Sequence, residues 1–233
     1  YLLKELPDMA EDLIRELFEA EFLPQDLQEN HAVCLEISQA LRKIKILDPA
    51  CGSGAYPMGV LNRMVELLQK LDCNEDESVY DQKLHLIEEC IYGVDVQTIA
   101  AQISKLRFFI SLICEQGAMN FEKENYGVIT LPNLETKFVA ANTLLGIKRK
   151  PAQLNVFEDP QIEVTKRELL QIRKEHFYAK TANAKKRLRE QDAELREKLS
   201  KLLRDNGDFA PEDAIQFSKW NPYDQNSTSP FFD

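Results

Sequence analysis

The stretch ILDPACGSGAYPMG, residues Ile46–Gly59, joins a short apolar segment to an amphipathic one through a glycine-rich turn. The apolar segment predicts a β-strand over residues 44–47, and the proline after Asp48 prevents its continuation. Beyond the turn, the apolar residues of Ala55–Leu71 recur at helical spacing. Pro57 falls in the first turn of this helix, where a missing N–H costs nothing. The stretch therefore predicts a strand, a turn and a helix.

The same unit follows a second time along the chain. Residues 90–96 predict a strand that ends in an acid at Asp95, and residues 97–116 predict the helix after it. A third strand is predicted over residues 137–144, ending near Asn142. Because strands alternate with helices without an internal sequence repeat, we expect an α/β fold in which helices cover both faces of a parallel sheet.

The remaining segments are predicted to be helical or irregular. One helix is expected from a cap at Asp8 to Pro24, and another over Ala32–Arg42. Residues 161–206 lack glycine and proline and carry leucines at steps of seven, four and three, which predicts a helical hairpin with a break near Thr181–Asn183. We divide the chain into an N-terminal helical segment (1–43), a strand–helix core (44–150), the hairpin (161–206) and an irregular tail (207–233).

Charge is distributed unevenly over the chain. The net charge is -10, yet residues 161–206 hold 13 Lys and Arg against 8 Asp and Glu, a net +5 that leaves -15 elsewhere. Because phosphate contacts require lysine and arginine, the chain as a whole is not a general polyanion binder. Any nucleic-acid contact should lie on this segment or outside the chain. The basic run KTANAKKRLR, residues 180–189, is more typical of a solvated helix face than of a DNA contact.

Composition indicates no membrane or metal chemistry. The longest apolar stretch, Phe108–Cys114, is too short to span a bilayer, and no leader opens the chain, so a cytoplasmic location is the default expectation. The five cysteines form no C-x-x-C pair, so we expect reduced thiols and neither disulfides nor a zinc site. The chain begins at Tyr1 and is expected to come from a longer protein.

The glycine turn should hold a ligand, because ligands of open parallel sheets bind beyond the carboxyl ends of the strands. Gly52 and Gly54 permit positive φ and close approach of the backbone, and the next helix offers free N–H groups. A dinucleotide fingerprint would need glycine where Pro57 stands, and no G-K-[ST] follows for a triphosphate. A phosphate ligand is therefore disfavoured.

Three motifs together carry a resemblance to a known family. DPACGSG (48–54) resembles the first motif of the S-adenosylmethionine-dependent DNA methyltransferases of bacterial restriction-modification systems that methylate an amino group. IYGVDVQTIAAQISKLRFFISL (91–112) resembles their second strand and helix, and VAANTLLG (139–146) resembles their third motif. The resemblance is good over residues 44–146 and less specific over the hairpin and tail, a combination similar to large adenine-specific enzymes that often carry a fused endonuclease.

The resemblance implies a Rossmann-like methyltransferase fold and S-adenosylmethionine as the cofactor. It implies that Asp95 takes the ribose hydroxyls and that Asn142 addresses the adenine ring. The cofactor carboxylate suits the N–H groups of residues 50–54, and its sulfonium suits Asp48. The full set of expected cofactor-binding residues is Asp48, Pro49, Ala50, Cys51, Gly52, Ser53, Gly54, Asp95, Val96, Asn142 and Thr143.

Each of these residues also has a structural interpretation. Asp48 can cap the turn, Asp95 can cap a loop, and Asn142 can form an Asn-Thr turn. Cys51 fits a small core residue and has no histidine partner that would make it a nucleophile. The three histidines, His31, His85 and His176, are expected to be surface or packed side chains.

The catalytic motif of the family, an Asn or Asp followed by two prolines and an aromatic residue that clamps the flipped base, is absent from the chain. Asn221-Pro222-Tyr223 imitates it with a single proline, and we assign it no catalytic role. We expect the true motif and its strand to follow Asp233, so the fragment alone should be inactive. Without that strand, the free edge of the first strand should be covered by a neighbouring chain, the N-terminal helices or the tail, or should promote self-association.

The sequence therefore favours the cofactor-binding part of a site-specific DNA methyltransferase. It would methylate the exocyclic amine of adenine in a restriction-modification or phage-defence system, on double-stranded DNA held mostly by parts outside this chain. An RNA or protein-glutamine methyltransferase, or a noncatalytic helical and Rossmann-like assembly scaffold, remains an alternative.

Overall fold

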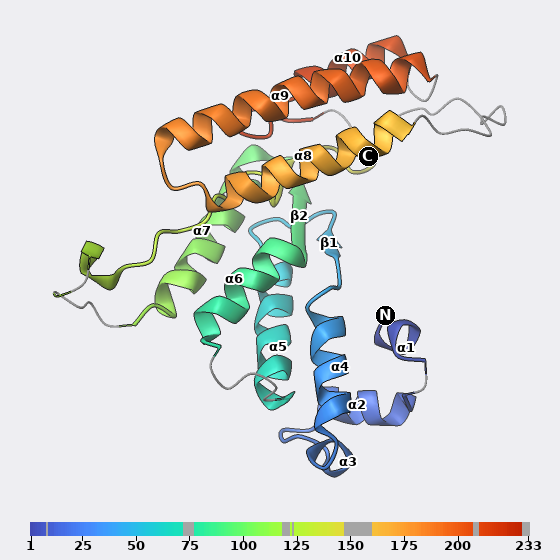
Figure 1. The fold of residues 1–233 in the computed structure, drawn as a ribbon, viewed down its shortest axis with the longest axis vertical. Coiled ribbons are helices and arrows are strands. Elements are labelled where there is room, and N and C mark those ends of the chain that lie inside the picture. The colour runs from blue at the N-terminus through green and yellow to red at the C-terminus, as the bar shows by residue number, and fades with distance from the viewer. Residues whose placement is uncertain are drawn as a thin grey trace.

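Two strand–helix–strand units form the centre of the protein in a computed structural model, which describes residues 1–7, 9–71, 77–117, 122, 124–146, 160–206 and 210–229 (Figure 1). In order, the elements of these units are β1 (Ile46–Asp48), α5 (Ala55–Leu71), α6 (Val79–Glu89), β2 (Ile91–Asp95), α7 (Thr98–Cys114) and β3 (Phe138–Ala140). The helix predicted after the glycine turn has the predicted bounds. The first strand begins two residues later than predicted, and the third is shorter than the predicted range 137–144.

Within the described residues the sheet has three parallel strands in the order β1-β2-β3. Asp48 pairs in register with Gly93, and Asp95 pairs with Ala140. The carboxyl ends of all three strands therefore meet at one edge of the sheet. The predicted parallel α/β arrangement is confirmed.

Helices α5, α6 and α7 pack against one another and against β2, on a single face of the sheet. The other face borders a cleft lined by Arg173, Phe217 and Trp220 of the C-terminal third, so the predicted cover of both faces does not come from the helices between the strands. The reason is chiral: right-handed crossovers that advance in the same direction, from β1 to β2 to β3, place their helices on the same side. Ile91 and Phe138 point to this face and are fully buried, whereas Leu47, on the opposite face, is 43% exposed. That opposite face borders a cleft of about 350 Å³.

Gly93 in the middle of β2 allows the buried face to close. A Cβ atom there would lie 2.6 Å from Cδ1 of Phe138 and 3.1 Å from Sγ of Cys51. The Phe138 ring in turn packs against Phe108 of α7, with ring centroids 4.5 Å apart. A side chain at position 93 would therefore displace both the core aromatic pair and the start of the glycine turn.

The N-terminal segment is a series of short helices that reach the core through α4. They are α1 (Leu2–Glu5), α2 (Glu11–Glu19), α3 (Gln25–Gln28) and α4 (His31–Leu41). The predicted cap Asp8 lies outside the described residues, and α2 ends well before Pro24. Helix α4 is within one residue of its predicted bounds and is capped by Asn30, whose side chain accepts a hydrogen bond from the N–H of Val33.

The C-terminal third contains the predicted hairpin and one helix that was not predicted. Helices α8 (Pro160–Tyr178) and α9 (Ala182–Asp205) are separated at Thr181, whose side chain caps α9. Helix α10 (Pro211–Lys219) lies in the tail, so the prediction that residues 207–233 are irregular is wrong for residues 211–219. Pro211 is the first residue of α10, the position at which proline starts a helix and does not interrupt it.

The tail returns to the sheet beside β3. Ser229 donates its N–H to the carbonyl of Ala140 (2.9 Å) and accepts from the N–H of Asn142 (3.1 Å), which forms a parallel bridge at Ala141. The described part of the tail, residues 210–229, therefore pairs beside β3 and not with the free edge of β1, which was one of the predicted alternatives. Among the described residues, no strand pairs with that edge.

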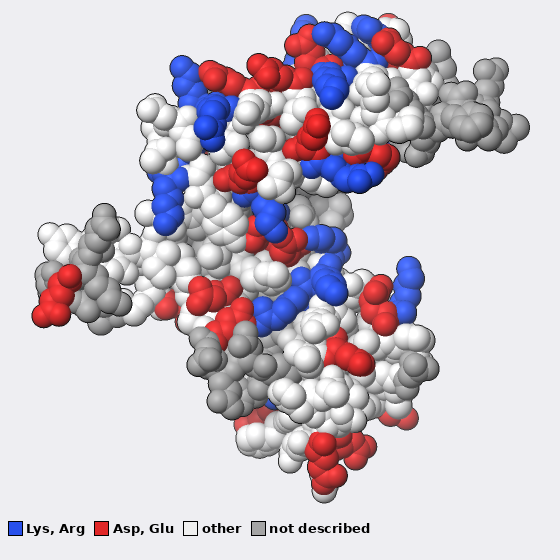
Figure 2. Space-filling model, viewed as in Figure 1, with Lys and Arg blue, Asp and Glu red and all other residues white. Residues whose placement is uncertain are grey.

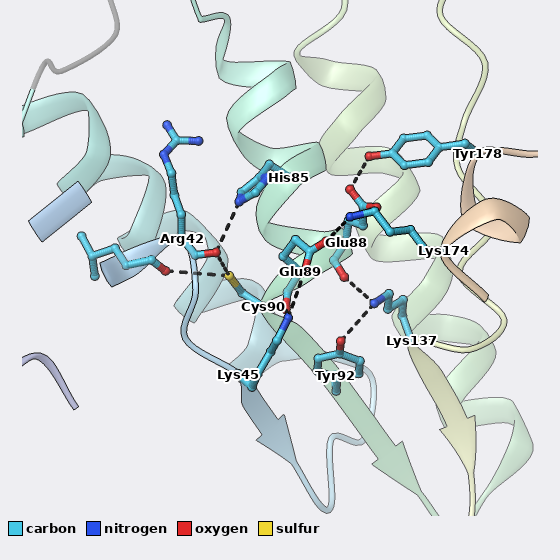
Figure 3. Close-up of polar contacts among 11 residues, drawn as sticks. Arg42, Lys45, His85, Glu88, Glu89, Cys90, Tyr92, Lys137, Lys174 and Tyr178 are labelled. Atoms are coloured by element: carbon cyan, nitrogen blue, oxygen red, sulfur yellow. Dashed lines mark hydrogen bonds and ion pairs between the residues drawn. The ribbon is translucent and has the colours of Figure 1, made fainter. Parts of the chain in front are cut away.

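A polar cluster ties α8 to the amino ends of the strands, on the side of the sheet away from the glycine turn (Figure 3). Glu89, at the end of α6, accepts hydrogen bonds from Lys45 before β1 (3.0 Å) and Lys174 of α8 (2.7 Å). These two cations, Lys174 foremost, lower the pKa of Glu89 to about 2. Tyr178 of α8 donates to Glu88 in the same cluster. The amino ends are thus occupied by α8, and the carboxyl ends are left for a ligand.

Candidate cofactor-binding site

The turn after β1 adopts a conformation that only glycine accommodates easily. Gly52 has φ +53° and Gly54 has φ +78°, both in the left-handed region. A Cβ atom on Gly54 would lie 2.8 Å from Oγ of Ser104, which is too close for any side chain. A Cβ atom on Gly52 would meet no protein atom within 4 Å. Gly54 is therefore required by the fold, whereas the backbone of Gly52 borders open space.

Hydrogen bonds fix this turn to both neighbouring strand ends. Ala50 donates its N–H to Oδ1 of Asp48 (3.1 Å), so Asp48 caps the turn as its structural interpretation proposed. Gly52 donates its N–H to Oδ2 of Asp95 (3.0 Å), at the end of β2. The other carboxylate oxygen of Asp95 accepts from the N–H of Gln97 (2.8 Å), at the start of α7. The first two predicted motifs are thus in direct contact.

The third motif reaches the same place. Thr143 donates its hydroxyl to the carbonyl of Pro49 (2.9 Å), which joins the segment after β3 to the turn after β1. Oδ1 of Asn142 accepts from the N–H of Leu144 (3.1 Å), so Asn142 forms the turn considered as its structural alternative. Val96 follows Asp95 and is 60% exposed at this edge. All the sequence-predicted site residues therefore lie along one edge of the sheet.

Few N–H groups of the turn are available to a ligand. Those of Ala50, Cys51, Gly52 and Gly54 already have acceptors within the protein. Among the described residues, the N–H groups of Ser53, Ala55 and Tyr56 have none, and the last two open helix α5. A helix start with unpaired N–H groups attracts an anion. Beside it, Asp48 and Asp95 suit hydroxyl donors and a cation.

Ser104 is a site residue that sequence reasoning missed. This serine of α7 is fully buried and donates its hydroxyl to the carbonyl of Gly52 (3.0 Å). Its Oγ also lies 3.8 Å from Sγ of Cys51. The available signal was a serine on the buried stripe of an otherwise apolar helix, between Ala101 and Phe108. The hydroxyl of Ser104 therefore holds the glycine turn against helix α7.

Cys51 is a small core residue, which was the structural alternative to a role in cofactor binding. It is 5% exposed, and burial raises the pKa of its thiol. A raised pKa keeps the sulfur protonated and poorly nucleophilic. Among the described residues, no group of His, Cys, Asp and Glu side chains could hold a metal ion.

The imitation of the catalytic motif is structural. Oδ1 of Asn221 accepts from the N–H of Tyr223 (3.1 Å), which closes a local turn. The Tyr223 hydroxyl donates to Oδ2 of the fully buried Asp192 (3.1 Å), and its ring packs on His176 with centroids 4.6 Å apart. These contacts anchor the tail to the hairpin. His176 is fully buried, as a packed histidine.

Comparison with known proteins points to one family. A type II restriction enzyme and methyltransferase, as its name describes it, from Methanocaldococcus jannaschii is 33% identical over 130 residues, which cover 54% of this chain and 11% of that protein. The adenine-specific methyltransferase PglX of Streptomyces coelicolor is 25% identical over 81 residues, 35% of this chain and 6% of that protein. No solved structure matches the chain.

This chain thus spans about a tenth or less of the length of these curated relatives. None of the described helices has the length and apolar character required to cross a membrane.

A family model, the DNA-methyltransferase domain of MmeI, matches residues 25–145, more than half of the 233 residues. The matched region contains the glycine turn, Asp95 and Asn142, the residues that the hydrogen bonds bring to one edge of the sheet. The chain belongs to the MmeI DNA-methyltransferase domain family.

Proposed function

We propose that this chain is the S-adenosylmethionine-binding part of a DNA methyltransferase that modifies the exocyclic amine of adenine. The observation that carries the proposal is the hydrogen bond from Gly52 to Asp95, which brings the glycine turn and the second acidic strand end into one site. Thr143 adds the third strand end through Pro49. The fold is then a Rossmann-like methyltransferase core in which three strand ends address three parts of one cofactor.

The free groups of the site fit the parts of S-adenosylmethionine, which supplies an electrophilic methyl group when bound. The N–H groups of Ser53, Ala55 and Tyr56 would take the carboxylate, a shift of a few residues from the range 50–54 expected from the sequence. Asp95 retains lone pairs for the ribose hydroxyls after accepting two backbone N–H groups. The open space beside Gly52 gives the cofactor room to approach the backbone.

The remaining predicted contacts with the cofactor are inferred from where each residue lies along the edge of the sheet. Asp48 would lie beside the sulfonium of the cofactor, which a carboxylate stabilises. Asn142 uses its Oδ1 in a turn, and its side-chain amide N–H groups would address the adenine ring. Val96 and Thr143 would contact the ribose and adenine portions.

Adenine in DNA is the proposed target because a relative bears the name adenine-specific methyltransferase and the matched family is one of DNA methyltransferases. The base clamp of such enzymes has no counterpart among the sequence motifs of this chain, so the chain by itself would bind cofactor without transferring methyl groups. The larger protein would act in a restriction-modification or phage-defence system, on double-stranded DNA.

Isothermal titration calorimetry with S-adenosylmethionine tests the proposal. The wild-type chain should bind, and Asp95→Ala should weaken binding at least tenfold, because it removes both the ribose acceptor and the anchor of Gly52. Asp224→Ala is the matched control, since Asp224 also accepts a backbone N–H (3.0 Å from Asn226) but lies in the tail. No binding by the wild-type chain, or equal binding by the Asp95 variant, contradicts the proposal. Absent cofactor binding together with tight binding to another protein would favour an assembly scaffold.

A further inference from the structure

A groove of about 580 Å³ runs between the first half of α9 and the end of α10. One wall is a single face of α9, because its lining residues recur at helical spacing. The other wall is the segment that leaves α10. The lining residues are Ala182, Lys185, Lys186, Arg189, Glu190, Ala193, Arg196, Ser218, Lys219 and Asn221.

Five cations and one acid line this groove. The two arginines among them form ion pairs with acids that are not part of its lining. Arg189 pairs with Glu135 (3.1 Å). Arg196 pairs with the buried Asp192 (2.6 Å) and is itself 3% exposed. What remains for an external partner is therefore a set of lysines.

The lysines of the groove have little internal compensation. Among the described residues, no ion pair involves Lys185 or Lys219. Lys186 and Glu190 are 3.9 Å apart, with side chains 78% and 63% exposed, which makes a weak and easily exchanged pair. Figure 2 shows Lys and Arg side chains at the end of the hairpin where α9 begins, and Lys and Arg interleaved with Asp and Glu along the rest of the hairpin.

The far wall of the groove is held rigidly by a buried cation. The guanidinium of Arg196 donates to the carbonyl of Ser218 (2.9 Å) and to that of Trp220. Lys219 lies between these two anchored carbonyls, so its backbone is fixed against α9. The backbone that carries Lys219 is therefore fixed opposite α9 before any partner arrives, so that only lysine side chains have to be ordered on binding.

We propose that this groove binds the phosphate backbone of DNA, through Lys185, Lys186 and Lys219. The proposal rests on the proposed function for the nature of the polyanion, and on the geometry for the place. The chain outside residues 161–206 has a net charge of -15, so a phosphate backbone is repelled elsewhere and attracted to this hairpin. Lysine contacts to phosphate position the duplex and carry no sequence information. The run at 180–189, expected to be a solvated helix face, is on this interpretation a DNA contact.

Fluorescence anisotropy with a labelled duplex of about 20 base pairs, titrated over a series of salt concentrations, tests the groove. The variant Lys185→Gln/Lys186→Gln/Lys219→Gln removes three charges from it. The matched control, Lys166→Gln/Lys198→Gln/Lys201→Gln, removes three exposed lysines of the same hairpin that pair with Glu163, Glu168 and Glu197 outside the groove. Circular dichroism verifies that both variants fold.

The groove variant should bind DNA at least tenfold more weakly at low salt, and its slope of log K against log salt should fall by about 2–3. The control should change affinity less than threefold. Equal loss in both variants, or no loss in the groove variant, overturns the proposal, and stronger binding of an RNA duplex than of DNA overturns the assignment to DNA. Calorimetry with S-adenosylmethionine on the groove variant should match the wild type. Failure of cofactor binding in the wild type would count against the proposed function and leave the groove to be judged by the DNA titrations.

Discussion

The backbone N–H of Gly52 lies 3.0 Å from Oδ2 of Asp95, and this single hydrogen bond connects the turn after the first strand to the end of the second. Because the other oxygen of Asp95 accepts from Gln97, the carboxylate is held in one orientation by two backbone donors. The shape of the site therefore exists before a ligand binds, and substitutions in it should separate effects on folding from effects on binding.

The two glycines of the turn should respond differently to alanine. Gly54→Ala combines left-handed backbone strain with a Cβ atom only 2.8 Å from Oγ of Ser104 and should cost about 2–4 kcal/mol of unfolding free energy. Gly52→Ala meets no atom and should cost only about 1–2 kcal/mol. Urea denaturation measures both.

Gly52→Ala, the less destabilising of the two variants, should have the larger effect on cofactor affinity. Gly52→Ala should lose S-adenosylmethionine binding at least tenfold at a temperature where it remains folded, because its Cβ enters the space beside the turn. Normal calorimetric affinity in folded Gly52→Ala would show that the ligand does not use that space.

The anchor of the tail should be a major contributor to stability. Asp192 is fully buried and pairs with Arg173 (2.9 Å) and Arg196 (2.6 Å). Asp192→Ala leaves the Arg196 guanidinium buried without a counter-charge and should cost about 3–5 kcal/mol. Glu194→Ala, an exposed acid on the same helix, should change the unfolding free energy by less than about 0.5 kcal/mol. Similar denaturation midpoints for the two variants would refute this account.

The ion pairs of Glu89 should make stability depend on acid pH. The pKa of Glu89 is about 2 in the folded protein against 4.5 for the free group, so its stabilisation is complete above pH 4.5 and is lost as the pH falls toward 2. Glu89→Gln should lower the unfolding free energy by about 1–2 kcal/mol at pH 7, after allowance for its partial exposure. The gap between wild type and variant should shrink below pH 4.5.

The control for this titration is Glu66→Gln, which breaks an exposed pair with Arg63. It should cost less than about 0.5 kcal/mol and show little dependence on pH. A wild-type advantage over Glu89→Gln that stays constant from pH 7 to pH 3 would be inconsistent with the ion pairs as its source.

Hydrogen exchange should reveal the state of the sheet edge. The N–H of Ile46 donates to the carbonyl of Cys90 (2.7 Å) and should be protected. Successive N–H groups of a strand point to opposite edges, so that of Leu47 faces the free side of β1 and should exchange much faster. Strong protection of Leu47 that weakens on dilution would instead show that another copy of the chain covers this edge.

Much of the fold was predictable because local signals agreed with the tertiary structure. The apolar spacing of Ala55–Leu71 defined both ends of α5, and the acid at Asp95 marked the end of β2. The glycines and acids of the site were likewise found from their positions after strands, since the carboxyl ends of parallel strands converge.

The features that were missed depend on long-range or positional information. Sequence alternation does not say in which direction the sheet grows, so it could not show that the helices between the strands all lie on one face. Helix α10 was overlooked because its proline was interpreted as a breaker, although Pro211 followed by two acids is the pattern of a helix start. The role of Ser104 depends on its contact with Gly52, far away in the sequence.

The bridge between Ser229 and the end of β3 makes the two edges of this sheet unequal in their ability to accept another strand. One border is already occupied at its carboxyl end, whereas among the described residues no strand pairs with β1, so a newly arriving strand would dock alongside β1. A strand that docks there in parallel would finish next to Asp48, and its final side chains would complete the wall of the ligand site. Extension of the sheet and completion of the pocket would then be one and the same event.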